Sequence, residues 1–158
     1  MLHMAHPNIY AGDFEYDPDD PPGYQAGIAR IGQAAGGKDQ SVRLFEIPAG
    51  EAICPFHYEF TEEWLILLDG ELDLRTPTGT ERIERGTVVC FPAGPDGAHK
   101  TTNPGPETAR LLMWSSAREP SVSVYPDSDK IGVWPGNDAD KIMVRRVDGQ
   151  VPYYDGEV

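Results

Sequence analysis

The sequence has few basic residues and no long apolar run, and each shortage argues against a class of protein. It carries 13 Lys and Arg residues against 26 Asp and Glu residues, a formal net charge of −13 at pH 7. A surface this acidic repels the phosphates of nucleic acids and of anionic membranes, so we expect no nucleic-acid partner and no membrane partner. No apolar run approaches the roughly 20 residues that a transmembrane helix needs.

The sequence also has few cysteines and shows no export signal in its first residues. Cys54 and Cys90 are the two cysteines, and they lack the Cys-x-x-Cys spacing of a metal site. They could form one bridge or remain thiols. Residues 1–7 contain no apolar stretch of the length that a signal peptide requires, so we expect a cytoplasmic protein with reduced thiols. The Gly-x-Ser-x-Gly motif of serine hydrolases is also missing, and no glycine-rich phosphate loop precedes a helix.

The 17 glycines and 15 prolines, in a chain of 158 residues, favour a turn-rich single domain over a helical bundle. No window shows a sustained helical period, whereas short apolar or alternating runs are frequent. We predict an all-β fold with strong strands at residues 28–31, 41–47, 64–68, 71–75, 81–84, 87–91 and 109–114. Weaker strand candidates are residues 122–126, 131–134 and 141–146.

The composition divides the chain into three parts. Residues 1–26, rich in Pro and Asp, are expected to form an extended arm, residues 27–119 a β-barrel, and residues 120–158 a C-terminal extension packed on that barrel. In the extension, Trp134, Tyr153 and Tyr154 are expected to be packing anchors, because large aromatic side chains dominate such contacts.

Two strand-loop-histidine units occupy the middle of the chain. Residues 55–70 place polar side chains directly before the apolar run 64–68, and residues 86–103 place a short apolar strand before Pro, Gly and His. If Glu63 faces a central cavity, alternation directs Trp64, Ile66 and Leu68 to the opposite face. That apolar outer face, with the aromatic arm, predicts a homodimer.

The two units resemble the paired motifs of the cupin superfamily, in particular small single-domain bacterial cupins of undefined activity. The first motif has Gly, His-x-His, Glu and Gly, matched here by Gly50, His57, Glu59, Glu63 and Gly70. The second has Gly, Pro-x-Gly, His and Asn, matched by Gly86, Pro92, Gly94, His99 and Asn103. The resemblance implies a double-stranded β-helix, the cupin jelly-roll barrel, and turn positions at its glycines and at Asn103.

The resemblance also implies a divalent metal ion, Mn²⁺, Fe²⁺, Ni²⁺ or Zn²⁺, held by His57, Glu63 and His99. One departure is that Glu59 stands where the family has its second histidine. Alternation places Glu59 on the same face as His57, so it could be a fourth ligand, the catalytic general base, or the partner of an arginine. Two imidazoles and one carboxylate already form a facial metal site with open positions.

Alternation also predicts which neighbours avoid the site. Glu62 is one residue out of phase with Glu63 and is expected to face outward. Phe56 and Tyr58 are expected to point away from the metal. Cys54, an odd number of residues before His57, is expected not to point inward beside it.

The functional hypothesis is a cupin metalloprotein that binds a small oxygen-bearing molecule in the barrel lumen. A metal-dependent isomerase, decarboxylase or dioxygenase acting on a sugar or a keto or carboxylic acid would fit this site. The alternatives are a non-catalytic module that binds a sugar or another small molecule, and a storage or structural protein.

Overall fold

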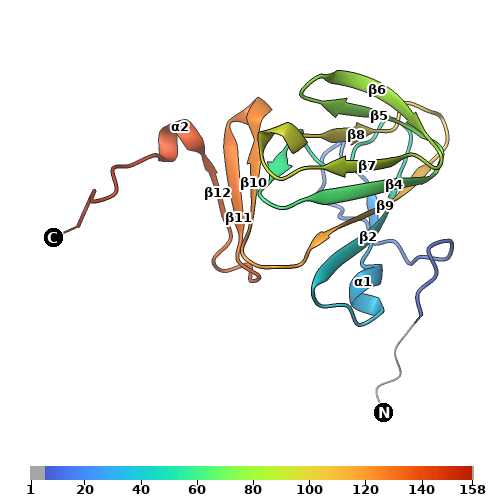
Figure 1. Cartoon of the computed structure of the whole chain (residues 1–158), viewed down its shortest axis with the longest axis horizontal. Coiled ribbons are helices and arrows are strands. Elements are labelled where there is room, and N and C mark those ends of the chain that lie inside the picture. The colour runs from blue at the N-terminus through green and yellow to red at the C-terminus, as the bar shows by residue number, and fades with distance from the viewer. Residues whose placement is uncertain (1–5, 158) are drawn as a thin grey trace, which may run out of the picture.

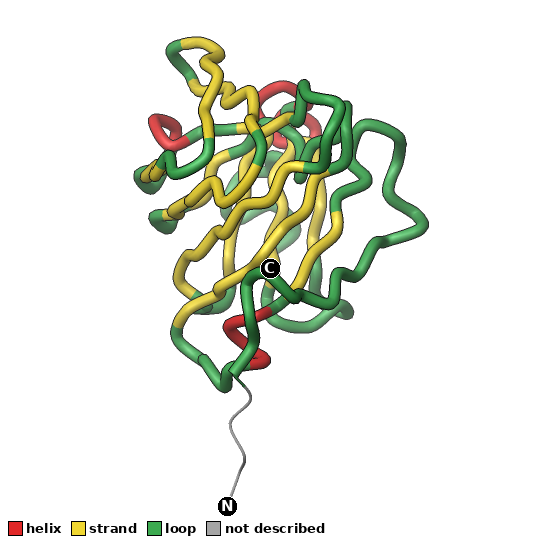
Figure 2. The backbone as a smooth tube through the Cα atoms, turned by 90° about the vertical axis from the view of Figure 1, so that its right-hand side faces the viewer, coloured by secondary structure: helices red, strands yellow, loops and turns green. Residues whose placement is uncertain are grey.

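The computed structural model describes residues 6–157, so the first five residues of the predicted arm lie outside it. Within this range the chain forms mostly antiparallel strands, joined by turns and four very short helices (Figures 1 and 2). The strands are β1 Gly27–Ala29, β2 Gln40–Ile47, β3 Tyr58–Glu59, β4 Glu63–Asp69, β5 Glu71–Thr76, β6 Gly79–Glu84, β7 Val88–Phe91, β8 Lys100–Thr102, β9 Ala109–Ser116, β10 Ser121–Tyr125, β11 Lys130–Trp134 and β12 Ile142–Arg145. The helices are α1 Ile31–Ala34, α2 Arg146–Gly149 and the 3-10 turns η1 Pro95–Gly97 and η2 Pro126–Ser128. The all-β prediction is confirmed.

Two sheets enclose the main core. The five-stranded sheet has the order β1-β2-β9-β4-β7 and the three-stranded sheet the order β6-β5-β8. Their facing side chains form one apolar cluster, in which each fully buried Leu or Ile contributes about 1.5–3 kcal/mol of hydrophobic stabilisation. The cluster consists of Phe45, Ile47, Leu65, Leu67, Leu72, Leu74, Ile83, Phe91, Ala109 and Leu111.

Strand β4 follows the predicted alternation. Leu65 and Leu67 are fully buried in the core, while Trp64, Ile66 and Leu68 are only partly buried on the outer face. Gly70, at the end of β4, has φ +78° and lies against Ala109, where an added Cβ would be 3.0 Å from the Ala109 Cα atom. The glycine therefore permits both the turn and the close approach.

A third sheet, with the order β12-β11-β10-β3, joins the C-terminal strands to the barrel. Its innermost pair is β10 with β3, in the register Ser123↔Glu59 and Val124↔Tyr58. Beyond β12, α2 and the following chain project away from the sheets (Figure 1). Tyr153 and Tyr154 are 89% and 77% exposed. The prediction that they pack the C-terminal extension onto the barrel is therefore wrong for the single chain.

Two further predictions need correction. The first predicted strand ends at Ala29, because Ile31–Ala34 turns into α1. The strand at 87–91 was expected to be buried, but Val88 and Cys90 are exposed. The reason is that β7 is an edge strand of its sheet and presents one face outward. Within residues 6–157 no helix is long and apolar enough to cross a bilayer.

Candidate metal centre

His57 and His99 meet across an isolated antiparallel bridge. The His57 N–H donates to the His99 carbonyl oxygen at 3.1 Å, and the His99 N–H donates to the His57 carbonyl oxygen at 2.8 Å. The two imidazole centroids are 4.8 Å apart. The backbone thus brings the two motif histidines, far apart in the sequence, to one point of the barrel.

Local backbone carbonyls orient both imidazoles in the same way. Nδ1 of His57 lies 3.1 Å from the Pro55 carbonyl oxygen, and Nδ1 of His99 lies 2.9 Å from the Gly97 carbonyl oxygen. A carbonyl accepts only from a protonated nitrogen, so each Nδ1 carries the hydrogen and each Nε2 keeps its lone pair. This is the arrangement of metal-binding histidines, whose second nitrogen donates to an oxygen.

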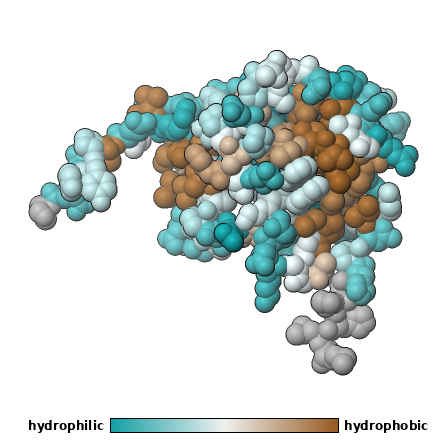
Figure 3. All heavy atoms as spheres, viewed as in Figure 1, coloured by the Kyte–Doolittle hydropathy of each residue, from teal (hydrophilic) through white to brown (hydrophobic). Residues whose placement is uncertain are grey.

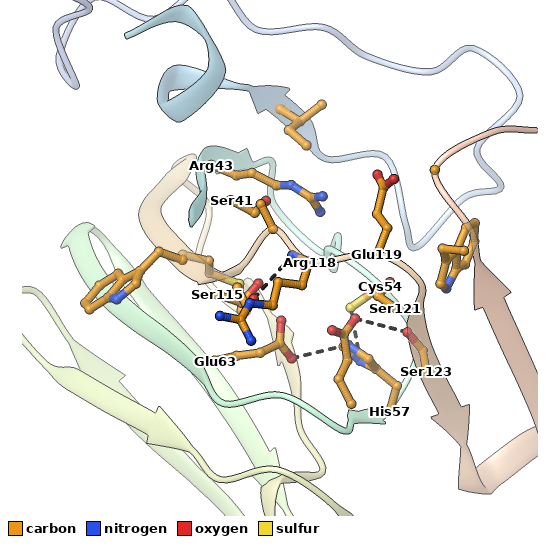
Figure 4. A pocket seen from close by; sticks show the side chains of 18 of the residues that line it. Ser41, Arg43, Cys54, His57, Glu63, Ser115, Arg118, Glu119, Ser121 and Ser123 are labelled. Carbon is orange, nitrogen blue, oxygen red and sulfur yellow. Dashed lines mark hydrogen bonds and ion pairs between the residues drawn. The ribbon is translucent and has the colours of Figure 1, made fainter. Parts of the chain in front are cut away.

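Glu63 completes a three-residue group. Its Oε2 lies 3.9 Å from Nε2 of His57 (Figure 4). The same oxygen lies 3.8 Å from Nε2 of His99. One ligand atom from each residue lies within 4.8 Å of the others. Nε2 of His99 is buried and has no hydrogen-bond partner among residues 6–157. A buried polar atom without a partner is costly, and a metal ion is one group that would satisfy it.

The electrostatics also suit a cation. Burial and the neighbouring His57 lower the pKa of His99 to about 3, so its imidazole is neutral at physiological pH. Burial and the charge of Glu59 raise the pKa of Glu63 to about 8, although Arg43 opposes that rise. Two neutral imidazoles and a desolvated carboxyl group fit a divalent ion, which would favour ionisation of that carboxyl.

Glu59 lies beside this group but outside it. It pairs across the sheet with Ser123, whose hydroxyl donates to Oε1 of Glu59 at 3.0 Å. Both residues line the same cavity as His57 and Glu63. The carboxylate therefore has one oxygen occupied by a hydrogen bond within the chain, and its arginine-partner alternative is not seen among the ion pairs of residues 6–157.

Aromatic rings pack on both histidines. Phe91 stacks on His99 with a centroid distance of 3.7 Å, and Tyr125 stacks on His57 at 5.8 Å. Neither contact was predicted. Phe91 reaches the site because β7 pairs with β4 in a register that sets Phe91 opposite Glu63, and Tyr125 comes from β10, so no local pattern in the sequence specifies either contact.

The prediction for Cys54 is wrong, and the prediction for Glu62 is confirmed. Sγ of Cys54 lies 3.5 Å from Nδ1 of His57 and lines the cavity. The residues between Ala52 and His57 form bends rather than a strand, so alternation does not apply to them. Glu62 is exposed and accepts a hydrogen bond from Nε1 of Trp64 on the outer face.

The group opens into a cavity of about 670 Å³, a size typical of small-molecule sites. Its wall carries cations and hydroxyls that sequence analysis did not single out (Figure 4). They are Arg43, Arg118, Lys141, Ser41, Ser115, Ser116, Ser121 and Ser123. In the sequence, the alternation of residues 41–45 was the pattern that could have placed Ser41 and Arg43 on the inner face of their strand.

Fold and site together define a double-stranded β-helix protein with a His, Glu, His group in its lumen. Residues 43–115 match the family model of the cupin domain. Residues 43–115 are therefore identified as a cupin domain, as the two motifs predicted, and the predicted jelly-roll barrel is confirmed.

Among solved structures, a putative sugar phosphate isomerase from Acidithiobacillus ferrooxidans is 25% identical, with a TM-score of 0.77 over 89% of this chain and 88% of that one. A cupin-superfamily sugar phosphate isomerase from Silicibacter pomeroyi is 21% identical, with a TM-score of 0.78 over 96% and 98%. A protein from Thermotoga maritima, named a predicted oxalate decarboxylase, is 18% identical, with a TM-score of 0.57 over 69% and 96%. No curated protein matches the chain.

Proposed function

We propose that the chain is a divalent-metal-dependent isomerase of a small hydroxy-carbonyl compound of the sugar type. Its metal ligands would be His57, Glu63 and His99. The observation that carries the proposal is the buried Nε2 of His99, which faces Glu63 and lacks a hydrogen-bond partner. When bound, the ion would act as a Lewis acid toward oxygen atoms of the substrate.

Glu59 favours isomerisation over decarboxylation or dioxygenation. By the enediol route, moving a carbonyl group along a carbon chain uses a base that removes a proton from one carbon and returns it to the next. With Oε1 of Glu59 accepting from Ser123, Oε2 is free to accept and return that proton. The name of the 25%-identical Acidithiobacillus protein, a putative sugar phosphate isomerase, supports the same choice.

The metal site is tested by elemental analysis of protein purified without added metal and after reloading with Mn²⁺, Fe²⁺, Ni²⁺ or Zn²⁺. We expect near-stoichiometric metal in the wild type and its loss in His57→Ala, His99→Ala and Glu63→Gln. Glu62→Gln is the matched control, because Glu62 is adjacent and faces outward. A wild type that holds no metal under any of these conditions would refute the site.

The reaction is tested by NMR in deuterated water with a panel of aldoses, ketoses and their phosphates. An isomerase that uses a base incorporates solvent deuterium at the carbon next to the carbonyl. Glu59→Gln should keep the metal and lose about 10²- to 10⁴-fold of that exchange. A ligand that stabilises the protein and is recovered unchanged, with no exchange across the panel, would favour the binding-module alternative.

We also propose that the outer face of the five-stranded sheet binds a second copy of the chain. Trp64 and Trp114 stack there with centroids 5.8 Å apart and an interplanar angle of 8°. Ile66 pairs with Leu112 on one side and with Val88, 56% exposed, on the other. Figure 3 shows apolar side chains gathered over β4, β7 and β9.

A continuous apolar sheet face of this kind marks an interaction surface, and two such faces can pack against each other as in a sandwich. Sedimentation at micromolar concentration should give a dimer for the wild type and a monomer for Ile66→Asp. The control is Val147→Asp, which changes an exposed apolar residue on the projecting C-terminal segment. A monomeric wild type would exclude this assembly.

A further inference from the structure

Three cations line a cavity in a protein that is otherwise strongly acidic. Arg43, Arg118 and Lys141 all contribute to its wall. Lys141 lies over the Trp134 ring, 4.4 Å from its centroid. For the two arginines, no carboxylate in residues 6–157 lies within 4.0 Å of the guanidinium group.

Most other arginines of the described chain are ion-paired. Five have carboxylate partners: Arg30, Arg75, Arg82, Arg110 and Arg146. With 26 acidic against 13 basic residues, carboxylates are abundant enough to pair every arginine. Arg43 and Arg118 are exposed and, like Arg85 and Arg145, have no carboxylate partner among residues 6–157, so their guanidinium groups are available for an external anion.

The strand register places hydroxyls between these arginines and the metal centre. Ser41 on β2 stands opposite Ser115 on β9, and Ser115 stands opposite Glu63 on β4. Arg43 lies two residues after Ser41, on the same inner face. The row from β2 to β4 crosses two strand spacings, about 10 Å, so the arginine end of the cavity is separate from the metal end.

Arg118 lines the same cavity from another element. It follows β9, and its backbone N–H donates to Oγ of Ser116 at 3.2 Å, which holds the start of the connection to β10. Figure 4 shows Arg43 beside Ser41 and Arg118 beside Ser115, with the Arg118 side chain extending toward Glu63.

We propose that Arg43 and Arg118, with the hydroxyls of Ser41 and Ser115, form an anion subsite. It would hold a phosphate or carboxylate group of the ligand at the end of the cavity away from His57. Guanidinium groups bind such oxyanions through paired N–H donors, and serine hydroxyls supply further donors. The ligand class is therefore a short hydroxy-carbonyl compound with an anionic group at its far end.

The positions of the acidic residues are consistent with a cavity that has a metal end and an arginine end. Glu59 and Glu63 are at the metal end, whereas Glu119 and Asp138 belong to the connections around the rim. The carboxylate of Glu119 packs against Gly136. Both arginines are exposed and therefore solvated without a ligand, and an anionic group would form charge-assisted hydrogen bonds with them that a neutral sugar cannot form.

The inference rests on the proposed function only in taking this cavity as the substrate site, and it can be tested without the metal. Calorimetric titrations of chelator-treated protein would use glycerol 3-phosphate, succinate and glycerol at fixed pH and low salt. Variants are Arg43→Gln and Arg118→Gln. The control is Arg85→Gln, because Arg85 is exposed between β6 and β7 and does not line the cavity.

We expect one or both anions to bind the wild type more tightly than glycerol. Each cavity variant should weaken that binding roughly tenfold or more, and Arg85→Gln should leave it unchanged. The anion that binds more tightly identifies the group as phosphate or carboxylate.

Equal binding of glycerol and the anions, or equal losses in Arg43→Gln and Arg85→Gln, would overturn the subsite. Because no metal is present, a protein that fails every metal and exchange test can still pass this one. A protein that binds metal and catalyses exchange can likewise fail it, so the two proposals are separable.

Discussion

Gly97 packs directly against the backbone of Pro92, so that a Cβ atom at Gly97 would overlap the Pro92 carbonyl oxygen. The same Gly97 supplies the carbonyl oxygen that orients Nδ1 of His99. One residue without a side chain therefore lets the η1 turn close and aims a proposed ligand at the metal centre.

Gly97→Ala should therefore damage both stability and metal binding. The overlap is with backbone, so η1 must shift, and we expect a loss of about 1–3 kcal/mol in the free energy of unfolding. Metal affinity should fall by about 10- to 100-fold, as when the outer partner of a histidine ligand is disturbed. Urea unfolding and metal titration check the two effects. Gly149→Ala is the control, since a Cβ there meets only Val144 at ordinary contact distance.

Asn103 is a structural residue, as its turn position predicted. It is 1% exposed, and its Nδ2 donates to the carbonyl oxygens of Ile47 and Glu107 at 2.7 Å each. Its Oδ1 accepts from the Gly105 N–H at 2.9 Å. Asn103→Ala would leave these backbone groups unpaired and should cost about 2–3 kcal/mol of unfolding free energy. Equal urea midpoints for this variant and the exposed Asn137→Ala would contradict that role.

Glu63 should make the stability of metal-free protein fall as the pH rises. Its pKa is raised from 4.5 to about 8, mainly by burial, so between these values the folded state keeps a proton that the unfolded chain has released. The pKa values of His57 and His99 are lowered from 6.5, mainly by burial, so above pH 6.5 both imidazoles are predominantly neutral in either state. The window from pH 6.5 to 8 therefore isolates the contribution of Glu63.

Urea unfolding of chelator-treated protein should thus show a free energy of unfolding that decreases from pH 6.5 to 8. Glu63→Gln should flatten this decrease, and the outward-facing Glu62→Gln should not. In the wild type, saturating metal should remove this decrease in the free energy of unfolding, because metal binding to the folded state favours the ionised carboxylate of Glu63. Identical pH profiles for Glu63→Gln and the wild type would exclude this role for Glu63.

The two cysteines should differ in reactivity toward iodoacetamide. Burial, with the charges of Glu63 and Glu59, raises the pKa of Cys54 to about 12, so its thiolate is scarce at pH 8. Cys90 is exposed on the edge strand β7. Mass spectrometry should show Cys90 modified at least an order of magnitude faster in native protein, and both modified in urea. Faster modification of Cys54 would mean that its side chain leaves the cavity.

Much of the fold followed from local patterns. Alternation from Glu63 correctly assigned Trp64, Ile66 and Leu68 to the outer face, and the strands predicted at 71–75 and 81–84 are the paired β5 and β6. Prediction failed where a segment was irregular, as at Cys54, or where exposure depended on sheet order, as at Val88. Neither property is encoded in the periodicity of a few neighbouring residues.

The sequence by itself determined the all-β class, because residue types at short spacing decide strand alternation and turn positions. It also contains the two histidine motifs, whose resemblance to the cupin motifs implied the candidate ligands. Only the tertiary structure decided that His57 and His99 share one backbone bridge and that Ser123 holds Glu59. It alone placed Arg43 and Arg118 in the same cavity. These are contacts between segments far apart in the chain, and they depend on strand order and register, which packing of the whole domain selects.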